Sequence, residues 1–355
     1  MSTSFFLVRW LYQAMNWVYE QMNAMFNGGG WVVVLTILLF TLGIKLLTVF
    51  GDIKSRKSSI QMQKLQPELD KLKKKYGNDP QKMSIEQRKL QKEHGVSMFG
   101  GCLPMLIMLP LLFMFFEAFR AWSNQQTLKL MIDIANGKGV DTFNSFRFLW
   151  ITNIWRPDNL RGGSTLLNGT EFWTTFAATN NVKNFIFYEN NANVLNEILY
   201  KLHFFTMTTG ENGAIEYVLA SDGGLAFREA YQNFVLPITS SIGGSGYETM
   251  SNGYAILPLL AGATTFLSSW IMQKTQPKPA VQSDDKNDPA AQTQNMSKWM
   301  MYLFPFMSVF FCWQYDATFA FYWIFSNVFS LAVTLILNAT VFKKTQSEPM
   351  EVVKS

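Results

Sequence analysis

Histidine and cysteine are scarce in this chain of 355 residues, with two of each. The histidines, His94 and His203, lie far apart, and no His-Glu-x-x-His, Gly-x-Ser-x-Gly or phosphate-binding glycine loop occurs. The chain therefore has few residues suited to general-base catalysis, metal binding or nucleotide binding. Cys102 and Cys312 both lie in apolar segments, which argues against a disulfide framework. We expect no catalytic residues, no metal site and no cofactor, and a protein that is not an enzyme.

Charge is also scarce, because only 15% of the residues are charged and 48% are apolar. Acidic residues are missing from the long apolar segments, which weakens the case for a proton-coupled transporter. Five segments have the length and composition of membrane-spanning helices. They are Trp31–Phe50, Met98–Phe116, Tyr254–Met272, Trp299–Tyr315 and Ala317–Phe342. The sequence therefore predicts an all-α polytopic membrane protein.

The distribution of Lys and Arg predicts the orientation. Residues 54–97 carry twelve Lys and Arg against five acids, whereas residues 121–250 carry eight against eleven. The positive-inside rule places the first of these segments in the cytoplasm and the N-terminus outside. With five spans, the C-terminus is then cytoplasmic. The net charge of +5 comes mainly from residues 54–97, so it does not argue for a direct nucleic-acid partner.

Local signals divide the rest of the chain. Ser4–Phe26 has polar residues at a spacing of three to four on an apolar helix, which suits a membrane interface or packing on the bundle. Gly77-Asn78-Asp79-Pro80 separates two charged helical stretches, with Asp79 as a cap and Pro80 in the first turn. The predicted order is an N-terminal interfacial helix (1–30), first span (31–50), cytoplasmic helical hairpin (51–97), second span (98–120), extracytoplasmic insertion (121–250), and last three spans (251–342) with a cytoplasmic linker (273–298) and a cytoplasmic tail (343–355).

Lys45 is the one formal charge within the twenty residues of the first span. An ammonium at the centre of a span costs about 2.5–3.5 kcal/mol on insertion scales. Lys45 lies nine residues before Lys54, so its side chain either snorkels towards the cytoplasm or is received by polar groups in the protein. Small polar residues in the spans could receive it or only bond their own helices. They are Thr36, Thr41, Thr264, Ser268, Ser269, Ser326 and Asn327.

Two long stretches resemble the YidC/Oxa/Alb family of membrane protein insertases. LGIKLLTVFGDIKSRKSSIQMQKLQPELDKLKKKYGNDPQKM and KLQKEHGVSMFGGCLPMLIMLPLLF are similar to its first span, hairpin and second span. ILPLLAGATTFLSSWIMQK, MMYLFPFMSVFF and AFYWIFSNVF are similar to its last three spans. The similarity covers roughly residues 5–120 and 250–342 and leaves out the insertion. It implies five core helices around a hydrophilic groove that opens to the cytoplasm and the lipid.

The resemblance also implies which residues line that groove. A basic residue, most often Arg, lies there in the family, and Lys45 occupies the matching position. Met108 stands where the family often has Gln, so this wall of the groove is expected to be less polar. Tyr322, Trp323, Ser326 and Asn327 match a motif of the fifth span that faces the client. Together with Thr41, these residues are the predicted substrate groove.

The function that the resemblance implies is insertion and chaperoning of membrane proteins in the bacterial cell membrane. Polar tails of clients would cross in the groove, and their spans would pass into the lipid. The alternatives are an assembly scaffold associated with a translocon, which the large insertion keeps open, and a small-solute transporter. Nascent membrane proteins and the lipid bilayer are the expected partners. A Sec-type translocon and the ribosome are further candidate partners, on which the sequence is silent.

Overall fold

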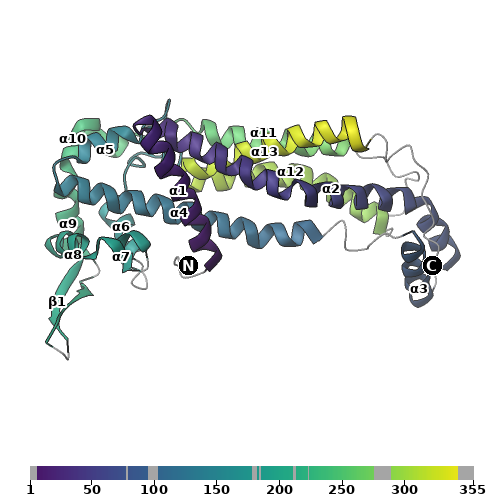
Figure 1. Cartoon of the computed structure of the whole chain (residues 1–355), viewed down its shortest axis with the longest axis horizontal. Coiled ribbons are helices and arrows are strands. Elements are labelled where there is room, and N and C mark those ends of the chain that lie inside the picture. The colour runs from purple at the N-terminus through teal and green to yellow at the C-terminus, as the bar shows by residue number, and fades with distance from the viewer. Residues whose placement is uncertain are drawn as a thin grey trace. The chain divides into compact units, whose positions relative to one another are not determined.

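The computed structural model of the chain is almost entirely helical (Figure 1). The structure describes residues 6–76, 79–94, 103–177, 182–183, 185–210, 213–222, 224–275 and 289–342. These residues fall into two compact units. Unit 1 contains residues 1–40, 113–259 and 309–322, and unit 2 contains residues 41–112, 260–308 and 323–355. Five long helices contribute residues to both units, and they are the helices that overlap the five predicted spans.

Four of these helices are α4 (Leu103–Ala135), α11 (Ile256–Thr275), α12 (Pro289–Gln314) and α13 (Ala317–Leu337), and a short π-helix, η3 (Asn338–Phe342), follows the last of them. The fifth, α2, runs without a break from Gly30 to Tyr76 and has 47 residues. The first span and the first arm of the predicted hairpin are therefore one element and not two. Pro67 lies inside this helix without ending it.

Unit 2 also contains the second arm of the hairpin, α3 (Pro80–Glu93). The prediction for its start is confirmed, because the Asp79 carboxylate accepts a hydrogen bond from the Lys82 amide at 3.0 Å and Pro80 is the first helical residue. Leu65 and Leu69 of α2 are buried together, and Leu90 of α3 packs against them. This apolar contact closes the hairpin.

The predicted span boundaries need adjustment. By length and composition, three of the described helices can cross a membrane: Gly30–Gly51, Ile256–Lys274 and Ala317–Thr340. The apolar part of α12, Met301–Gln314, is shorter, as the sequence predicts for the fourth span. The helix α12 begins at Pro289, so part of the predicted linker 273–298 is helical. Residues 98–102, 276–288 and the tail 343–355 lie outside the described residues.

The predicted N-terminal helix is α1 (Phe6–Phe26), which belongs to unit 1. One face is buried in the protein through Val8, Leu11, Tyr12 and Met15. Its Asn16 accepts a hydrogen bond from Gln125 of α4 at 3.1 Å. Large apolar side chains on the rest of the helix stay exposed, among them Phe6, Trp10 and Trp17. The helix therefore packs on the protein and also presents an apolar surface, and its place at a membrane interface stays a prediction.

The insertion forms most of unit 1 and is mainly helical. Its first fifteen residues, 121–135, continue α4. The other elements are α5 (Gly139–Ser145), α6 (Gly169–Ala177), α7 (Ile186–Asn190), α8 (Ala192–Lys201), β1 (Phe205–Thr209), β2 (Ile215–Leu219), α9 (Leu225–Phe234), α10 (Leu236–Ile242) and the 3₁₀ helix η2 (Gly244–Thr249). The strands pair antiparallel, with Met207 opposite Tyr217. Figure 1 shows this hairpin extending away from α8 and α9.

Buried polar residues hold the start of α11 to the insertion. The Asp158 carboxylate is fully buried and accepts hydrogen bonds from the amides of Ala255 and Leu257 at 3.0 and 2.8 Å. Because these amides lie at the N-terminus of α11, the negative charge also complements the helix dipole. A Cβ on Gly253 would overlap Asp158, which explains the glycine there. The insertion thus fixes where this span begins.

Asn252 completes that junction. Its side-chain nitrogen donates to the carbonyl oxygens of Asn153, Arg156 and Pro157 at 2.8, 3.1 and 3.0 Å. Its side-chain oxygen accepts from the Asn153 amide at 2.8 Å. The fully buried Asn252 side chain therefore supplies hydrogen-bond partners to backbone groups of this turn that would otherwise have none.

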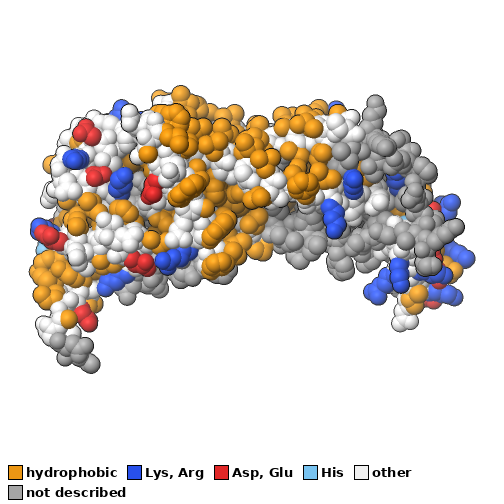
Figure 2. All heavy atoms as spheres, in the orientation of Figure 1, with side chains coloured by type: hydrophobic (Ala, Val, Ile, Leu, Met, Phe, Trp, Pro, Cys, Tyr) orange, Lys and Arg blue, Asp and Glu red, His pale blue; other side chains and the backbone are white. Residues whose placement is uncertain are grey.

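The span segments of unit 2 are apolar outside as well as inside. In α2, Leu47 and Phe50 are 81% and 78% exposed, and exposed Phe and Leu side chains also occur on α11 and α12. Figure 2 shows orange apolar side chains over the spans, and blue Lys and Arg side chains gathered over the α2–α3 hairpin. A soluble protein rarely exposes so much apolar surface, so this surface fits contact with lipid.

Candidate functional site

Lys45 lies in the span part of α2, in unit 2, and is half-buried. Its Nζ donates a hydrogen bond to Ser330 Oγ of α13 at 2.9 Å. The ammonium is thus directed to a second helix of the bundle, and not only along its own helix towards Lys54. Of the two outcomes that the sequence left open, this geometry matches reception by a polar group in the protein.

Thr41 precedes Lys45 by four residues, so the two lie on one face of α2. Thr41 is fully buried. Thr36 is also fully buried and donates to the carbonyl oxygen of Val32 at 2.8 Å, which is the purely local role considered for such residues. The polar face that α2 contributes to unit 2 therefore includes Thr41 and Lys45.

Ser330 did not stand out in the sequence, although a signal for it existed. On α13, polar side chains recur at Trp323, Asn327, Ser330 and Thr334, at spacings of four, three and four. These spacings place them on one face of a helix, which we call the α13 stripe. The predicted residues Trp323 and Asn327 begin this stripe, and Ser330 continues it to the level of Lys45.

Thr265 of α11 is a hydrogen-bonding centre for the α13 stripe. Its Oγ1 accepts from Trp323 Nε1 at 3.0 Å and from Asn327 Nδ2 at 2.8 Å. It also lies 2.7 Å from the carbonyl oxygen of Ala261 and 3.0 Å from Ser308 Oγ of α12. A hydroxyl has two lone pairs and one proton, so all of its capacity is used. Trp323 and Asn327 therefore tie α13 to α11 through Thr265, which also reaches α12.

The other predicted groove residues are placed differently. Tyr322 belongs to unit 1, where its ring stacks on Phe115 with centroids 4.7 Å apart. Ser326 is half-buried on α13. The side chain of Met108 lies outside the described residues. The structure thus brings Lys45 to Ser330, and joins Trp323 and Asn327 to residues of α11 that the prediction did not include.

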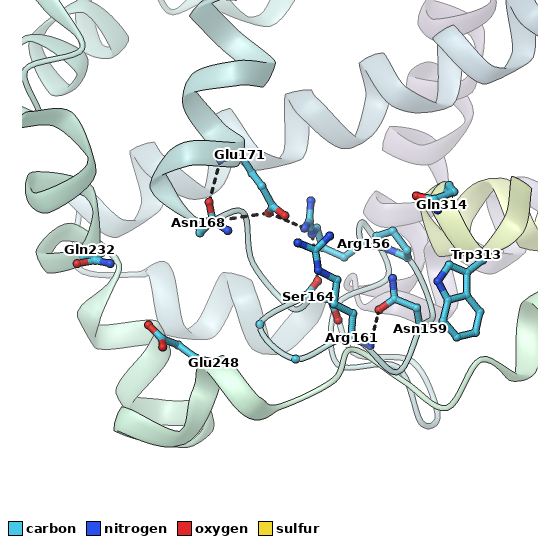
Figure 3. A pocket seen from close by; sticks show the side chains of 13 residues that line it. Arg156, Asn159, Arg161, Ser164, Asn168, Glu171, Gln232, Glu248, Trp313 and Gln314 are labelled. Atoms are coloured by element: carbon cyan, nitrogen blue, oxygen red, sulfur yellow. Dashed lines mark hydrogen bonds and ion pairs between the residues drawn. The ribbon is translucent and has the colours of Figure 1, made fainter. Parts of the chain in front are cut away.

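Unit 1 contains a polar cavity of about 350 Å³, shown in Figure 3. Arg156 reaches Glu171 at 2.9 Å and donates to the carbonyl oxygen of Ser164 at 3.1 Å. Arg161 and Glu248 add one charge of each sign to the lining. The charges are balanced, and much of the hydrogen-bonding capacity is used within the protein. In the described part of the chain, no group of three or more His, Cys, Asp and Glu could hold a metal ion.

A family model described as "60Kd inner membrane protein" matches residues 24–345. The chain is also similar to several proteins named "Membrane protein insertase YidC". The identity is 34% over 148 residues with the protein of Clostridium perfringens, covering 42% of this chain and 54% of that protein. For Clostridium tetani it is 36% over 122 residues, covering 34% and 47%, and for Fusobacterium nucleatum 44% over 87 residues, covering 24% and 42%. The chain spans about half the length of the curated relatives it matches.

Proposed function

The chain belongs to the 60Kd inner membrane protein family, the YidC/Oxa family, and from this premise we propose that it inserts proteins into the bacterial membrane. The observation that carries the proposal is the hydrogen bond of 2.9 Å between Lys45 and Ser330, which holds a cation between two apolar helices. Family members are insertases and not classical enzymes. The chemistry required is therefore the transfer of polar groups across an apolar layer.

We propose that Lys45 lowers the cost of that transfer. An isolated charge in hydrocarbon is expensive, and a cation in the same place compensates an acidic side chain that enters. The Lys45 ammonium carries three donor protons, so a client carboxylate can share it with Ser330. Acidic tails should therefore cross more readily than basic ones. The membrane potential, positive outside, acts on acidic tails in the same direction.

Release follows from the exposed apolar surface of unit 2. Burying apolar area is worth about 25 cal/mol per Å², so a client span that leaves the α13 stripe for lipid is driven by its own hydrophobicity. The proposal includes no nucleotide or metal. The proposed groove consists of Lys45 and the α13 stripe together with Thr41, Met108, Tyr322 and Ser326.

For orientation we propose that the α2–α3 hairpin and the C-terminus are cytoplasmic, and that the N-terminus and the insertion are outside. The twelve Lys and Arg of residues 54–97 support this orientation. The basic hairpin would then meet clients as they arrive from the cytoplasm. Nascent membrane proteins are the proposed partners. We further propose that the positive charge of the hairpin supports docking to a Sec-type translocon or to the ribosome.

The test is insertion of a small single-span client with an acidic tail into liposomes that contain only the purified protein. Protease protection measures the outcome. The Lys45→Ala variant should insert at least about tenfold less, because hydrogen bonds to charged groups are worth about 1.5–3 kcal/mol. Lys45→Arg is the matched control and should retain activity, since it keeps the charge.

A client with a neutral tail separates two explanations of a loss. The Ala variant should insert it nearly as well as the wild type does. Equal insertion of both clients by Lys45→Ala would show that the cation is dispensable. A folded wild type that inserts neither client would favour the scaffold function, in which the insertion binds assembling partners.

A further inference from the structure

A second polar cavity in unit 1, which we call the Asp316 cavity, has a volume of about 300 Å³. Its walls come from α4, the segment 155–157, the end of α6 and the turn between α12 and α13. The residues that matter here are Arg120, Ser123, Trp155, Arg156 and Asp316. We propose that this cavity binds the headgroup of a zwitterionic aminophospholipid, with its phosphate near Arg120 and Trp155 and its ammonium at Asp316.

A buried polar side chain of this lining lacks a partner. Trp155 is 3% exposed, and within the described residues its Nε1 has no hydrogen-bond partner. An orphaned buried polar group costs about 1–3 kcal/mol, so a ligand that pairs with it is stabilised. The indole N–H can only donate, which means that the ligand must offer an acceptor at this point.

The charged groups of the lining attract one another without forming a close ion pair. In the part of the chain that the structure describes, neither Arg120 nor Asp316 forms an ion pair. Arg156 is already used, because it bonds Glu171 and the Ser164 carbonyl. Burial raises the pKa of Asp316 to about 6, while the Ser123 hydroxyl and the two arginines act in the opposite direction. Burial outweighs these three contributions, so an ammonium beside the carboxylate would add to an attraction that is incomplete.

One ligand meets both needs if it has separate negative and positive groups. A phosphate offers acceptors to Arg120 and Trp155, and an amine of the same headgroup reaches Asp316. The neighbouring cavity of Figure 3 differs, because its Arg156–Glu171 ion pair is formed at 2.9 Å. The orphaned indole N–H of Trp155 and the incompletely compensated carboxylate of Asp316 thus distinguish the Asp316 cavity.

The position of the cavity favours a lipid over a soluble zwitterion. Gln314 ends the apolar helix α12, and Asp316 directly precedes the span that begins at Ala317. Residues at the ends of spans lie at the level of the lipid headgroups. A headgroup can therefore enter the cavity while its acyl chains stay beside the apolar helices.

The test uses the full-length protein, freed of lipid in detergent, with native mass spectrometry as the readout. The probes are short-chain phosphatidylethanolamine, phosphatidylglycerol, diacylglycerol, soluble glycerophosphoethanolamine and an acidic peptide. We expect one phosphatidylethanolamine to bind preferentially. Arg120→Gln and Asp316→Asn should each weaken its binding about tenfold or more, as expected for loss of a charge-assisted hydrogen bond. Ser123→Ala should weaken it less.

Arg161→Gln is the matched control, because it removes an arginine from the neighbouring cavity and should leave the affinity unchanged. Thermal unfolding of each variant checks that it is folded. Equal binding of phosphatidylglycerol and phosphatidylethanolamine would remove the ammonium from the proposal and overturn it. Three other results would also overturn the proposal. They are tighter binding of the acidic peptide than of phosphatidylethanolamine, equally tight binding of soluble glycerophosphoethanolamine, and binding of phosphatidylethanolamine no tighter than that of diacylglycerol.

Discussion

Lys45 and Ser330 are 285 residues apart in the chain and 2.9 Å apart in space. An ammonium in an apolar span needs an acceptor, and without one its long side chain extends towards water. Ser330 keeps the ammonium at the α2–α13 contact, which is where the proposed transfer requires it. The hydroxyl is therefore expected to matter for function although it carries no charge.

Replacing Ser330 by Ala should reduce insertion of acidic-tailed clients about tenfold or more, since it removes one hydrogen bond to a charged group. Insertion into liposomes measures this effect. Ser330→Thr keeps the hydroxyl and should behave like the wild type. If the Ala variant inserts as well as the Thr variant does, the position of the ammonium does not depend on Ser330.

Asp316 gives a second prediction for a single residue, this time of stability. Its pKa of about 6 in the folded protein lies above the ordinary value of 3.8, so folding favours the neutral form. The stabilisation is complete below the ordinary value and is lost as the pH rises through about 6. Asp316→Asn, which is always neutral, should therefore gain about 2 kcal/mol over the wild type between about pH 4.5 and 7.5.

Thermal unfolding of both proteins across this pH range measures the gain. Asp141→Asn removes an exposed carboxylate of the same unit and serves as the control. A constant difference between wild type and Asp316→Asn at every pH would contradict the raised pKa. A larger advantage of the Asn variant at low pH would contradict the sign.

At the scale of elements, the contact of α11 with α12 and α13 depends on few polar atoms. Lipid removes most of the hydrophobic drive for helices to associate, so packing and interhelical hydrogen bonds take its place. Thr265 supplies three such contacts, to Trp323, Asn327 and Ser308. Two of these partners belong to the α13 stripe that also contains Ser330. The positions of the Trp323 and Asn327 side chains in the α13 stripe therefore depend on Thr265, a residue of another helix.

Thr265→Val has nearly the same shape and removes the acceptor. It should destabilise the protein by about 1–3 kcal/mol, because the half-buried donors of Trp323 and Asn327 lose this acceptor. Thermal unfolding in detergent measures the loss. Thr264→Val is the control, since Thr264 accepts only the longer bond from Asn327, at 3.3 Å. Equal stability of the two variants would show that Thr265 is not the centre of this contact.

At the scale of the whole molecule, two units are built from one chain that passes repeatedly between them. Unit 1 depends on the insertion, because Asp158 and Asn252 hold the start of α11 there. Unit 2 contains Lys45, Ser330 and Thr265. Loss of the buried network in unit 1 should therefore loosen that unit before it affects the hydrogen bonds of unit 2.

Asn252→Ala tests this division. It should lower the stability of unit 1 by about 3 kcal/mol or more, because several buried backbone groups lose their partner at once. Hydrogen exchange should rise in residues 150–164 and at the start of α11, and remain nearly unchanged around Thr265 and Ser330. The exposed Asn233 of the same unit supplies the control substitution, Asn233→Ala. Uniform loosening of both units would show that they are not independent.

Local composition is enough to predict the helical spans, the capped hairpin and the unusual charge of Lys45. Twenty predominantly apolar residues fit the thickness of a bilayer, and Asp79-Pro80 starts a helix through contacts within its own first turn. The family resemblance added the list of groove residues. The unbroken helix α2 was missed because the change from apolar to charged residues marks the edge of a membrane and does not end a helix.

The partners of these residues depend on how the helices pack. Each of these partners is far away in the chain. Ser330 bonds Lys45, Thr265 bonds Trp323 and Asn327, and Asp158 bonds the start of α11. Serine and threonine in apolar helices bond their own backbone as readily as another helix, so composition cannot tell the two roles apart. Only packing, which brings one helix face against another, selects which hydroxyl meets which donor.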